Sequence, residues 1–312
     1  MGLKDLYIDR VTFGTDAIPY RSLFIKWRFS DIFYAVVIYL LDWFYFERIE
    51  PYERQFFIND LTISHPFAEV ERVSGAACVL IAFWIPAITI FTVNLLFTPK
   101  RHKLYILFVS ILGLCISIGT TTFLTDIGKN WIGRCRPDFL ARCIPKETAA
   151  KDTLYFAKDI CTQTDTKKLL DGFRTTPSGH SSISFAGLGY LTLWLSGQLM
   201  VSRIHGGAWR SIVALLPCLL AGYIALSRTQ DYRHHFVDVL LGTALGSLVA
   251  WWSYRRLFPT IASEVCYVPY VIIDEKTNKY SDTTSNFYES GDNYMMASTP
   301  SDLESADVRS TI

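Results

Sequence analysis

Long runs of hydrophobic residues alternate with polar segments along the chain. Six such runs cover about residues 31–46, 75–97, 104–125, 181–201, 209–226 and 236–254. The second and third approach the ~20 residues that a transmembrane helix needs, whereas the first is short and rich in aromatic residues. Helices buried in a soluble protein would carry a charged face, and these runs have almost no charged residues. The pattern therefore predicts an all-α, polytopic membrane protein with six transmembrane helices.

The polar segments divide the chain into three regions. Residues 1–30 form a polar N-terminal segment, residues 31–258 hold the six predicted helices, and residues 259–312 form a polar tail. From about Lys276 onward the tail is rich in Ser, Thr, Asn, Asp and Glu, so we expect it to be mostly disordered. An even number of spans places both ends of the chain on the same side of the membrane.

The composition supports a membrane protein and argues against other classes. Of the 312 residues, 50% are hydrophobic and 19% are charged, which is less charge than a soluble domain usually carries. A net charge of +1 provides no basic face of the size that nucleic acid binding needs. Nothing in the sequence indicates an obligate protein partner.

Basic residues in the short loops set the expected orientation. They gather in residues 1–30, at Lys100–Lys103, in the link 203–210 and at Arg255–Arg256, and all of these lie on one side. The positive-inside rule places that side, with both termini, in the cytosol. The long polar segment of about residues 126–177 is also basic, but several of its cations are candidates for chemistry. We therefore expect the catalytic side to face a lumen or the exterior.

Three polar clusters carry the candidate chemistry. They are Lys129 with Arg136 after the third run, Thr176–Ser181 before the fourth run, and Arg228, His234 and Asp238 between the fifth and sixth runs. Because transmembrane helices alternate in direction, all three clusters are expected on the same face of the membrane. The predicted fold therefore has its catalytic loops on one face.

The second cluster has the features of an anion site. Pro177 interrupts regular structure, and Ser178 is a suitable N-cap for a helix that starts at Gly179. The unpaired N–H groups and the dipole of the first helical turn attract an anion. His180 in that turn places a proton donor beside the anion, as cleavage of a phosphate ester requires.

The three clusters together resemble a known signature. They match K-x6-R-P at residues 129–137, P-S-G-H at 177–180 and S-R-x5-H-x3-D at 227–238. In order and spacing this pattern is similar to that of the lipid phosphate phosphatase (type-2 phosphatidate phosphatase) family. Residues 53–66 and 170–176 also resemble the fungal diacylglycerol pyrophosphate phosphatases of that family, and the resemblance covers about residues 25–258.

The resemblance implies a role for each residue. His234 would be the nucleophile that forms a phosphohistidine, Asp238 would orient it, and His180 would be the general acid. If the segment is helical, His234 and Asp238 share one face, so that the carboxylate can hold the imidazole. The phosphate would be bound by Lys129, Arg136, Ser178, Gly179 and Arg228. Three cations can stand in for a metal, and the resemblance implies a magnesium-independent enzyme without a cofactor.

The activity implied is removal of the β-phosphate of diacylglycerol pyrophosphate and dephosphorylation of phosphatidate to diacylglycerol. Its substrates would be lipid phosphates in the bilayer, in a vacuolar or other endomembrane. The alternatives are a phosphatase or phosphotransferase for another headgroup, such as a sphingoid-base phosphate, and a non-catalytic lipid binder or transporter. The sequence does not rank lipid substrates.

Several residues have other interpretations. Zinc binding by His180, His234, His235 and Asp231 is conceivable, but the nearby cations oppose it. Gly242 and Gly246 permit close helix packing, which we expect within one chain. Cys143 and Cys161 are either disulfide-bonded, in a luminal loop, or free thiols.

Overall fold

A computed structural model describes residues 26–46 and 48–273. The described part of the chain divides into two units after residue 267, and all the helices described below belong to the first. Most of the predicted N-terminal segment, and the predicted disordered tail from Lys276, lie outside the described residues. Both remain predictions, as do the region boundaries at residues 30 and 258.

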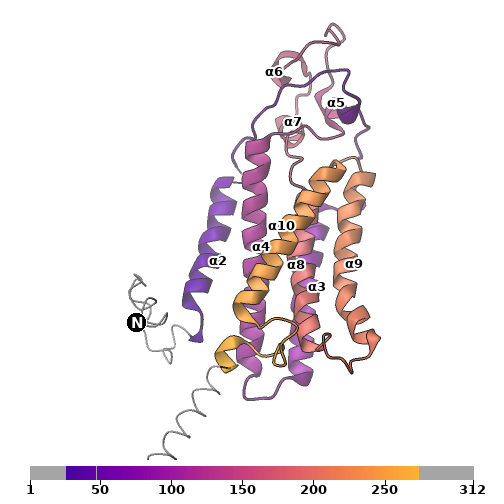
Figure 1. Ribbon diagram of the computed structural model, residues 1–312. Coiled ribbons are helices and arrows are strands. Elements are labelled where there is room, and N and C mark those ends of the chain that lie inside the picture. Colours follow the sequence, from indigo (N-terminus) through magenta and orange to yellow (C-terminus); the bar gives the residue numbers. More distant parts are fainter. Residues whose placement is uncertain (1–25, 47, 274–312) are drawn as a thin grey trace, which may run out of the picture. The chain divides into compact units, whose positions relative to one another are not determined.

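Every long hydrophobic run forms a helix (Figure 1). The long helices are α2 (Phe29–Leu41) continued by the π-helix η3 (Asp42–Phe46), α3 (Gly75–Phe97), α4 (Lys103–Ile132), α8 (Gly179–Gln198), α9 (Ala208–Gln230) and α10 (Phe236–Leu257). Among the described residues, five helical stretches are long and apolar enough to cross a membrane: Phe29–Phe46, α3, α4, α9 and α10. The chain is therefore a polytopic membrane protein. Helix α8 is long enough but more polar, so the predicted count of six spans is supported only in part.

Helix α8 is more polar because other helices surround it. It packs against α3, α4, α9 and α10, and Ser181, Ser182, Ser184 and Trp194 are among its buried residues. A helix that contacts protein on all sides has no need of an apolar surface for lipid. Its composition therefore reflects a central position in the bundle.

Two glycines let neighbouring backbones approach α8 closely. A Cβ atom at Gly246 on α10 would lie 2.2 Å from the carbonyl oxygen of Ser182, and one at Gly187 would lie 2.0 Å from that of Ala82 on α3. Any larger residue would separate the helices at these points. The predicted packing of the sixth run within the chain is confirmed at Gly246.

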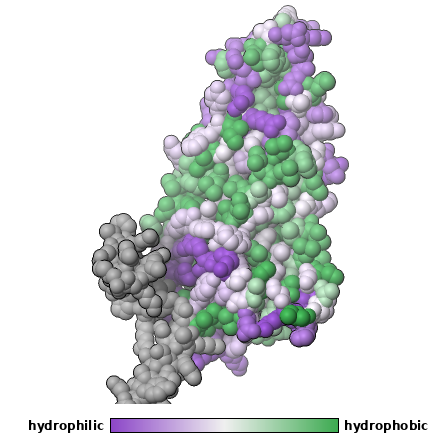
Figure 2. Space-filling model, in the orientation of Figure 1, coloured by the Kyte–Doolittle hydropathy of each residue, from purple (hydrophilic) through white to green (hydrophobic). Residues whose placement is uncertain are grey.

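The outer helices present apolar side chains to their surroundings. The buried residues of α3 recur every fourth position, at Cys78, Ala82, Pro86, Ile90 and Asn94, whereas Trp84 and Ile88 are exposed. Figure 2 shows hydrophobic residues gathered over the long helices and hydrophilic residues at the end that carries the short helices. This distribution is the one expected for helices in contact with lipid chains.

Helix α4 extends seven residues beyond the predicted end of the third run at Thr125. Asp126 and Lys129 in this extension form an i,i+3 ion pair of 3.2 Å, which is compatible with helix. The helix ends at Gly133, whose φ of 57° is the left-handed conformation that favours glycine. The prediction that Lys129 follows the third helix was therefore wrong, because polar residues continue α4 to Ile132.

A cap, defined as residues 133–178, covers one end of the bundle (Figure 1). It contains the short helices α5 (Phe139–Cys143), α6 (Ala157–Ile160) and α7 (Thr166–Asp171). Phe139, Phe173 and Ile160 form a small apolar core with Phe56 from the segment before α3, which also contains the 3₁₀ helix η4 (Leu61–Ile63). The cap therefore has its own core outside the membrane helices.

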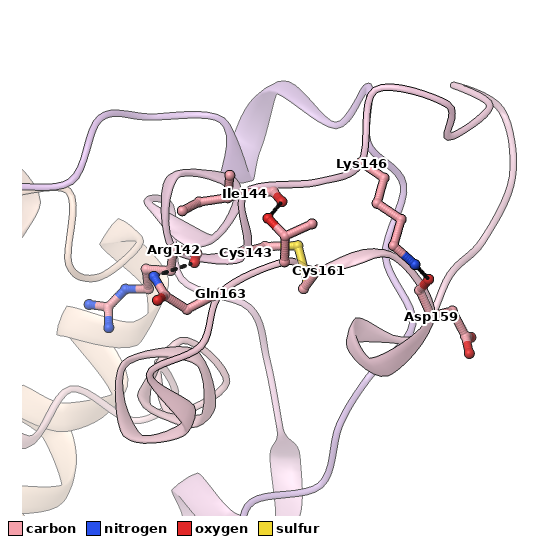
Figure 3. Close-up of a disulfide and its surroundings, with 8 residues drawn as sticks. Arg142, Cys143, Ile144, Lys146, Asp159, Cys161 and Gln163 are labelled. Atoms are coloured by element: carbon pink, nitrogen blue, oxygen red, sulfur yellow. Dashed lines mark hydrogen bonds between the residues drawn. A yellow bond between two sulfur atoms is a disulfide. The ribbon is translucent and has the colours of Figure 1, made fainter.

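A disulfide closes the outer part of the cap. Cys143 and Cys161, which the sequence left as either bonded or free, are joined (Figure 3). Beside the bond, Gln163 Nε2 donates to the carbonyl of Arg142 at 3.1 Å, and Lys146 Nζ donates to that of Asp159 at 2.9 Å. These hydrogen bonds join the two segments that flank the disulfide, residues 142–146 and 159–163.

Candidate active site

The three predicted clusters meet at the cap end of the bundle. The N–H of Ser178 donates to the carbonyl of Asp238 at 3.0 Å, which ties the start of α8 to the first turn of α10. Arg228 Nη1 lies 3.4 Å from His180 Nε2, so the end of α9 lies beside the start of α8. Residues separated by up to 109 positions in the sequence thus share one site, with Lys129 and Arg228 in the last turns of α4 and α9.

His234 is buried and held in one tautomer. Its Nδ1 lies 2.7 Å from the carbonyl oxygen of Thr175, which can only accept, so Nδ1 carries the proton and Nε2 keeps its lone pair. Burial, and then the cations Arg136 and Lys129, lower the pKa of His234 well below its usual value, although Asp238 opposes them. His234 is therefore neutral near pH 7, with Nε2 available as a nucleophile.

Asp238 is fully buried and is connected to His234 through Thr175. Its carboxylate accepts hydrogen bonds from Thr175 Oγ1 at 2.8 Å, from Thr176 Oγ1 and from the backbone N–H of His235 at 3.0 Å. Thr175 Oγ1 lies 3.3 Å from His234 Nδ1. The expected shared helical face does not form, because α10 begins at Phe236, two residues after His234. Among the described residues no hydrogen bond joins Asp238 directly to His234.

The start of α8 carries His180, as predicted. His180 Nε2 donates to the carbonyl of Val73 at 3.1 Å. Ser178 occupies the N-cap position, but its side chain makes no capping bond and instead accepts one from Ser181 Oγ at 3.0 Å. A Cβ at Gly179 would lie 2.9 Å from Lys129 Nζ. Glycine at this position therefore lets the ammonium group lie directly beside the helix start.

Each predicted phosphate-binding cation is paired with a carboxylate. Lys129 pairs with Asp126 at 3.2 Å and Arg136 with Asp171 at 2.8 Å. Arg228 is completely buried and is bound by Glu71 and Asp231; its distances to them are 3.0 and 2.7 Å. A substrate phosphate has to share or replace these partners.

Several site residues were not predicted from the sequence. Glu71 from the segment before α3 contacts Arg228 and, at 3.1 Å, Arg233, and its Oε2 lies 3.9 Å from His180 Nε2. No local motif marks Glu71, because its partners lie 157 and 162 positions away. The sequence could have indicated that Asp231 pairs with Arg228, because it lies one helical turn after Arg228.

Asp171 holds Arg136 from the cap. Burial raises the pKa of Asp171, but Arg136 and Arg142 lower it more, to about 2. Its carboxylate contacts Arg136 Nη2 at 2.8 Å and Arg142 Nη1 at 2.9 Å. Asp171 is therefore an anion throughout the physiological range, and it fixes the position of a site cation.

The zinc alternative has no geometric support in the described part of the chain. Within residues 26–46 and 48–273, no three His, Cys, Asp or Glu side chains are placed to hold a metal ion. Three cations, Lys129, Arg136 and Arg228, act on His180 or His234, beside the carboxylates of Glu71 and Asp238.

Comparison with known proteins covers every site residue that the sequence predicted. The model of the PAP2 superfamily matches residues 110–261. Diacylglycerol pyrophosphate phosphatase 1 of Saccharomyces cerevisiae is 52% identical over 245 residues, which are 78% of this chain and 84% of the yeast protein. The chain belongs to the PAP2 superfamily.

Other relatives in the superfamily cover a similar share of the chain. Probable diacylglycerol pyrophosphate phosphatase 1 of Schizosaccharomyces pombe is 39% identical over 258 residues, 81% of this chain and 90% of the relative. Probable lipid phosphate phosphatase 4 of Arabidopsis thaliana is 35% identical over 243 residues, 77% and 76% of the two chains. No solved structure matches the chain.

Proposed function

We propose that this PAP2 protein is a lipid phosphate phosphatase that removes the β-phosphate of diacylglycerol pyrophosphate and dephosphorylates phosphatidate to diacylglycerol. The names and high identity of the yeast relatives support this substrate class. The observation that carries the chemistry is the state of His234, which is buried, with Nδ1 committed to Thr175 and Nε2 left as the nucleophilic nitrogen. The substrates are amphiphiles of the bilayer, and the site lies at one end of a set of membrane helices.

In the first half-reaction, His234 Nε2 attacks the terminal phosphorus and forms an N–P bond while the bond from phosphorus to the leaving oxygen breaks. Asp238 acts as a positioning residue: through Thr175 it holds the segment whose carbonyl fixes the tautomer of His234. The imidazolium that develops is stabilised by the buried carboxylate nearby. Attack from Nε2 requires no prior deprotonation of the imidazole.

His180, acting as the imidazolium, gives its Nε2 proton to the leaving oxygen and becomes neutral. That oxygen takes the place of the Val73 carbonyl as the partner of His180 Nε2, which lies beside Arg228. In the second half-reaction, water attacks phosphorus, the N–P bond breaks, and His180 takes up the proton. The products are inorganic phosphate and the lipid with one phosphate fewer.

Charge on the transferring phosphoryl group is stabilised by Lys129, Arg136 and Arg228, with the N–H groups at Ser178 and Gly179 at the helix start. Phosphoryl transfer gains mainly from positioning and charge stabilisation, which fixed cations supply. The proposed reaction is therefore independent of magnesium.

We also propose that α8 is the sixth membrane span. Helix α8 has 20 residues and lies among four other long helices, so its polar residues are shielded from lipid. Both termini then lie in the cytosol, and the site and cap face the lumen of a vacuolar or other endomembrane. The disulfide in the cap supports this orientation, because disulfides persist in oxidising compartments.

The test is phosphate release from both lipids in detergent micelles with excess EDTA. We expect wild-type protein and His205→Ala, a histidine exposed in the α8–α9 link, to release phosphate, and His234→Ala to lose about 10⁴-fold in rate. Loss of wild-type activity in EDTA contradicts the metal-independent reaction. Activity of His234→Ala close to wild type contradicts the nucleophile, and wild-type inactivity on both lipids contradicts the substrate class.

A further inference from the structure

A cavity of about 750 Å³ lies beside the catalytic residues, between the end of the first span and the cap. Its walls come from η3, from residues 48–50 and from α7 with the segment that follows. The lining residues include Trp43, Arg48, Glu50, Lys167, Asp171 and Arg174. Trp43 is 62% exposed at the end of a candidate span, and such tryptophans mark the level of lipid headgroups. The cavity therefore lies where the polar part of a lipid is found.

The cavity shares its wall with the catalytic cluster. Asp171 lines the cavity and also holds Arg136. Arg174 lines the cavity, while the next residue, Thr175, binds His234 and Asp238. A phosphate held by Arg136 is therefore separated from the cavity only by the contact between Arg136 and Asp171.

The cations of the cavity differ from those of the catalytic cluster in their partners. Lys129, Arg136 and Arg228 each pair with a carboxylate, whereas no ion pair within the described residues includes Arg48, Lys167 or Arg174. Arg174 Nη2 donates to the carbonyl of Ile49, and its Nε is buried without a hydrogen-bond partner in the described part of the chain. The carboxylate of Asp171 is already neutralised by Arg136 and Arg142. An anion in the cavity can therefore bind these cations without displacing a carboxylate.

We propose that this cavity is a subsite for a second phosphate, the one that remains on the lipid after diacylglycerol pyrophosphate is cleaved. This inference rests on the proposed function. The two phosphorus atoms of a pyrophosphate share one oxygen, so a subsite for the second must adjoin the first. Asp171 supplies this link, because it lines the cavity and also pairs with Arg136. When phosphatidate is the substrate, its single phosphate is at His234, and the cavity faces uncharged glycerol. Arg48, Lys167 and Arg174 then determine preference between the two lipids.

The test compares kcat/KM for the two lipids in the same mixed micelles. Lys167→Glu reverses an exposed charge of the cavity, and Arg174→Gln removes the charge at its inner wall. Lys151→Glu, an exposed lysine of the cap that does not line the cavity, is the matched control for added negative charge at the membrane surface. We expect the ratio of kcat/KM for diacylglycerol pyrophosphate to that for phosphatidate to fall about tenfold in Lys167→Glu and Arg174→Gln, and to change less than twofold in Lys151→Glu.

An unchanged ratio in both cavity variants overturns the subsite, whether activity is retained or falls equally on both lipids. A ratio that falls equally in Lys151→Glu also overturns it, because the effect is then one of general surface charge. Arg174→Gln also loses the hydrogen bond to the Ile49 carbonyl and can therefore fold poorly. In that case Lys167→Glu, which changes an exposed side chain, still tests the subsite. Failure of the proposed function gives a different result, namely wild-type protein inactive on both lipids.

Discussion

Helices α8 and α3 lie side by side, yet they meet opposite surroundings. In α3 only five of the 23 residues are buried, along a single narrow face. In α8 twelve of the twenty residues are buried, and several of them are serine or glycine. Hydrophobicity therefore marks the helices that contact lipid, whereas the helix that begins at the candidate site is enclosed by protein and is more polar. In this chain, the long helix with the weakest membrane signal begins at the candidate site.

The largest expected effect comes from filling the contact between the two helices. Gly187→Leu places a side chain against the Ala82 carbonyl, 2.0 Å from the new Cβ. We expect a loss of about 3 kcal/mol in the free energy of unfolding, since overpacked contacts cannot relax without moving backbone. The matched change is Gly222→Leu on α9, where no atom lies within 4 Å of an added Cβ. Thermal unfolding in detergent compares the stability of the two variants, and equal unfolding midpoints would disprove the close contact.

The second effect separates the two ends of one helix. Arg228→Ala at the site end of α9 removes the proposed charge-assisted contact to the phosphoryl group, and we expect about a 100-fold loss of kcat/KM on phosphatidate. Arg210→Ala lies at the opposite end of α9, where Arg210 bonds the Leu199 carbonyl, and should stay within twofold of wild type. An Arg228→Ala enzyme with more than half of wild-type activity would remove Arg228 from the site.

The third effect is the pH dependence of stability that His234 causes. The folded state lowers the pKa of His234 far below that of the unfolded chain, so below about pH 6.5 the unfolded state binds one more proton and stability falls as pH falls. We expect wild-type protein to lose about 2 kcal/mol more than His234→Gln between pH 7 and pH 5. His205→Gln serves as the control and should follow wild type. Parallel curves for wild type and His234→Gln would show that His234 is not held neutral.

The smallest effect applies one substitution to both helices. Trp194 on α8 is 1% exposed and its Nε1 donates to Ser110 Oγ at 2.9 Å, whereas Trp84 on α3 is 53% exposed. Trp194→Phe loses a buried hydrogen bond and some packing, which costs about 1–2 kcal/mol. Trp84→Phe keeps an aromatic ring toward lipid and should be nearly neutral. Equal unfolding midpoints for the two variants would contradict the enclosed position of α8.

The helices and the site were predictable to different degrees. Hydrophobic runs located every long helix, since both lipid contact and packing among helices require apolar residues. They ended α4 and α9 too early, because polar residues at the site extend both helices. The three motifs placed the principal catalytic candidates at one end of the bundle. Their spacing could not show that Asp238 reaches His234 through Thr175, or that Glu71 pairs with Arg228, because both depend on contacts between distant segments.

The cap was the least predictable region. Its three short helices have no periodic pattern of their own, and they are held by a small core, ion pairs and one disulfide. Cysteine positions alone left the bonded and free forms of Cys143 and Cys161 equally possible. The cavity between the cap and the first span likewise depends on how these segments fold together.

The most direct test of the proposed chemistry is to trap the covalent intermediate. Wild-type protein and His234→Ala are mixed with phosphatidate radiolabelled in its phosphate, quenched within milliseconds in alkali, and digested for peptide mapping. We predict an alkali-stable, acid-labile label on the peptide that contains His234, and no label in His234→Ala. An acid-stable label on a serine or threonine, or a label that persists in His234→Ala, would contradict nucleophilic attack by His234.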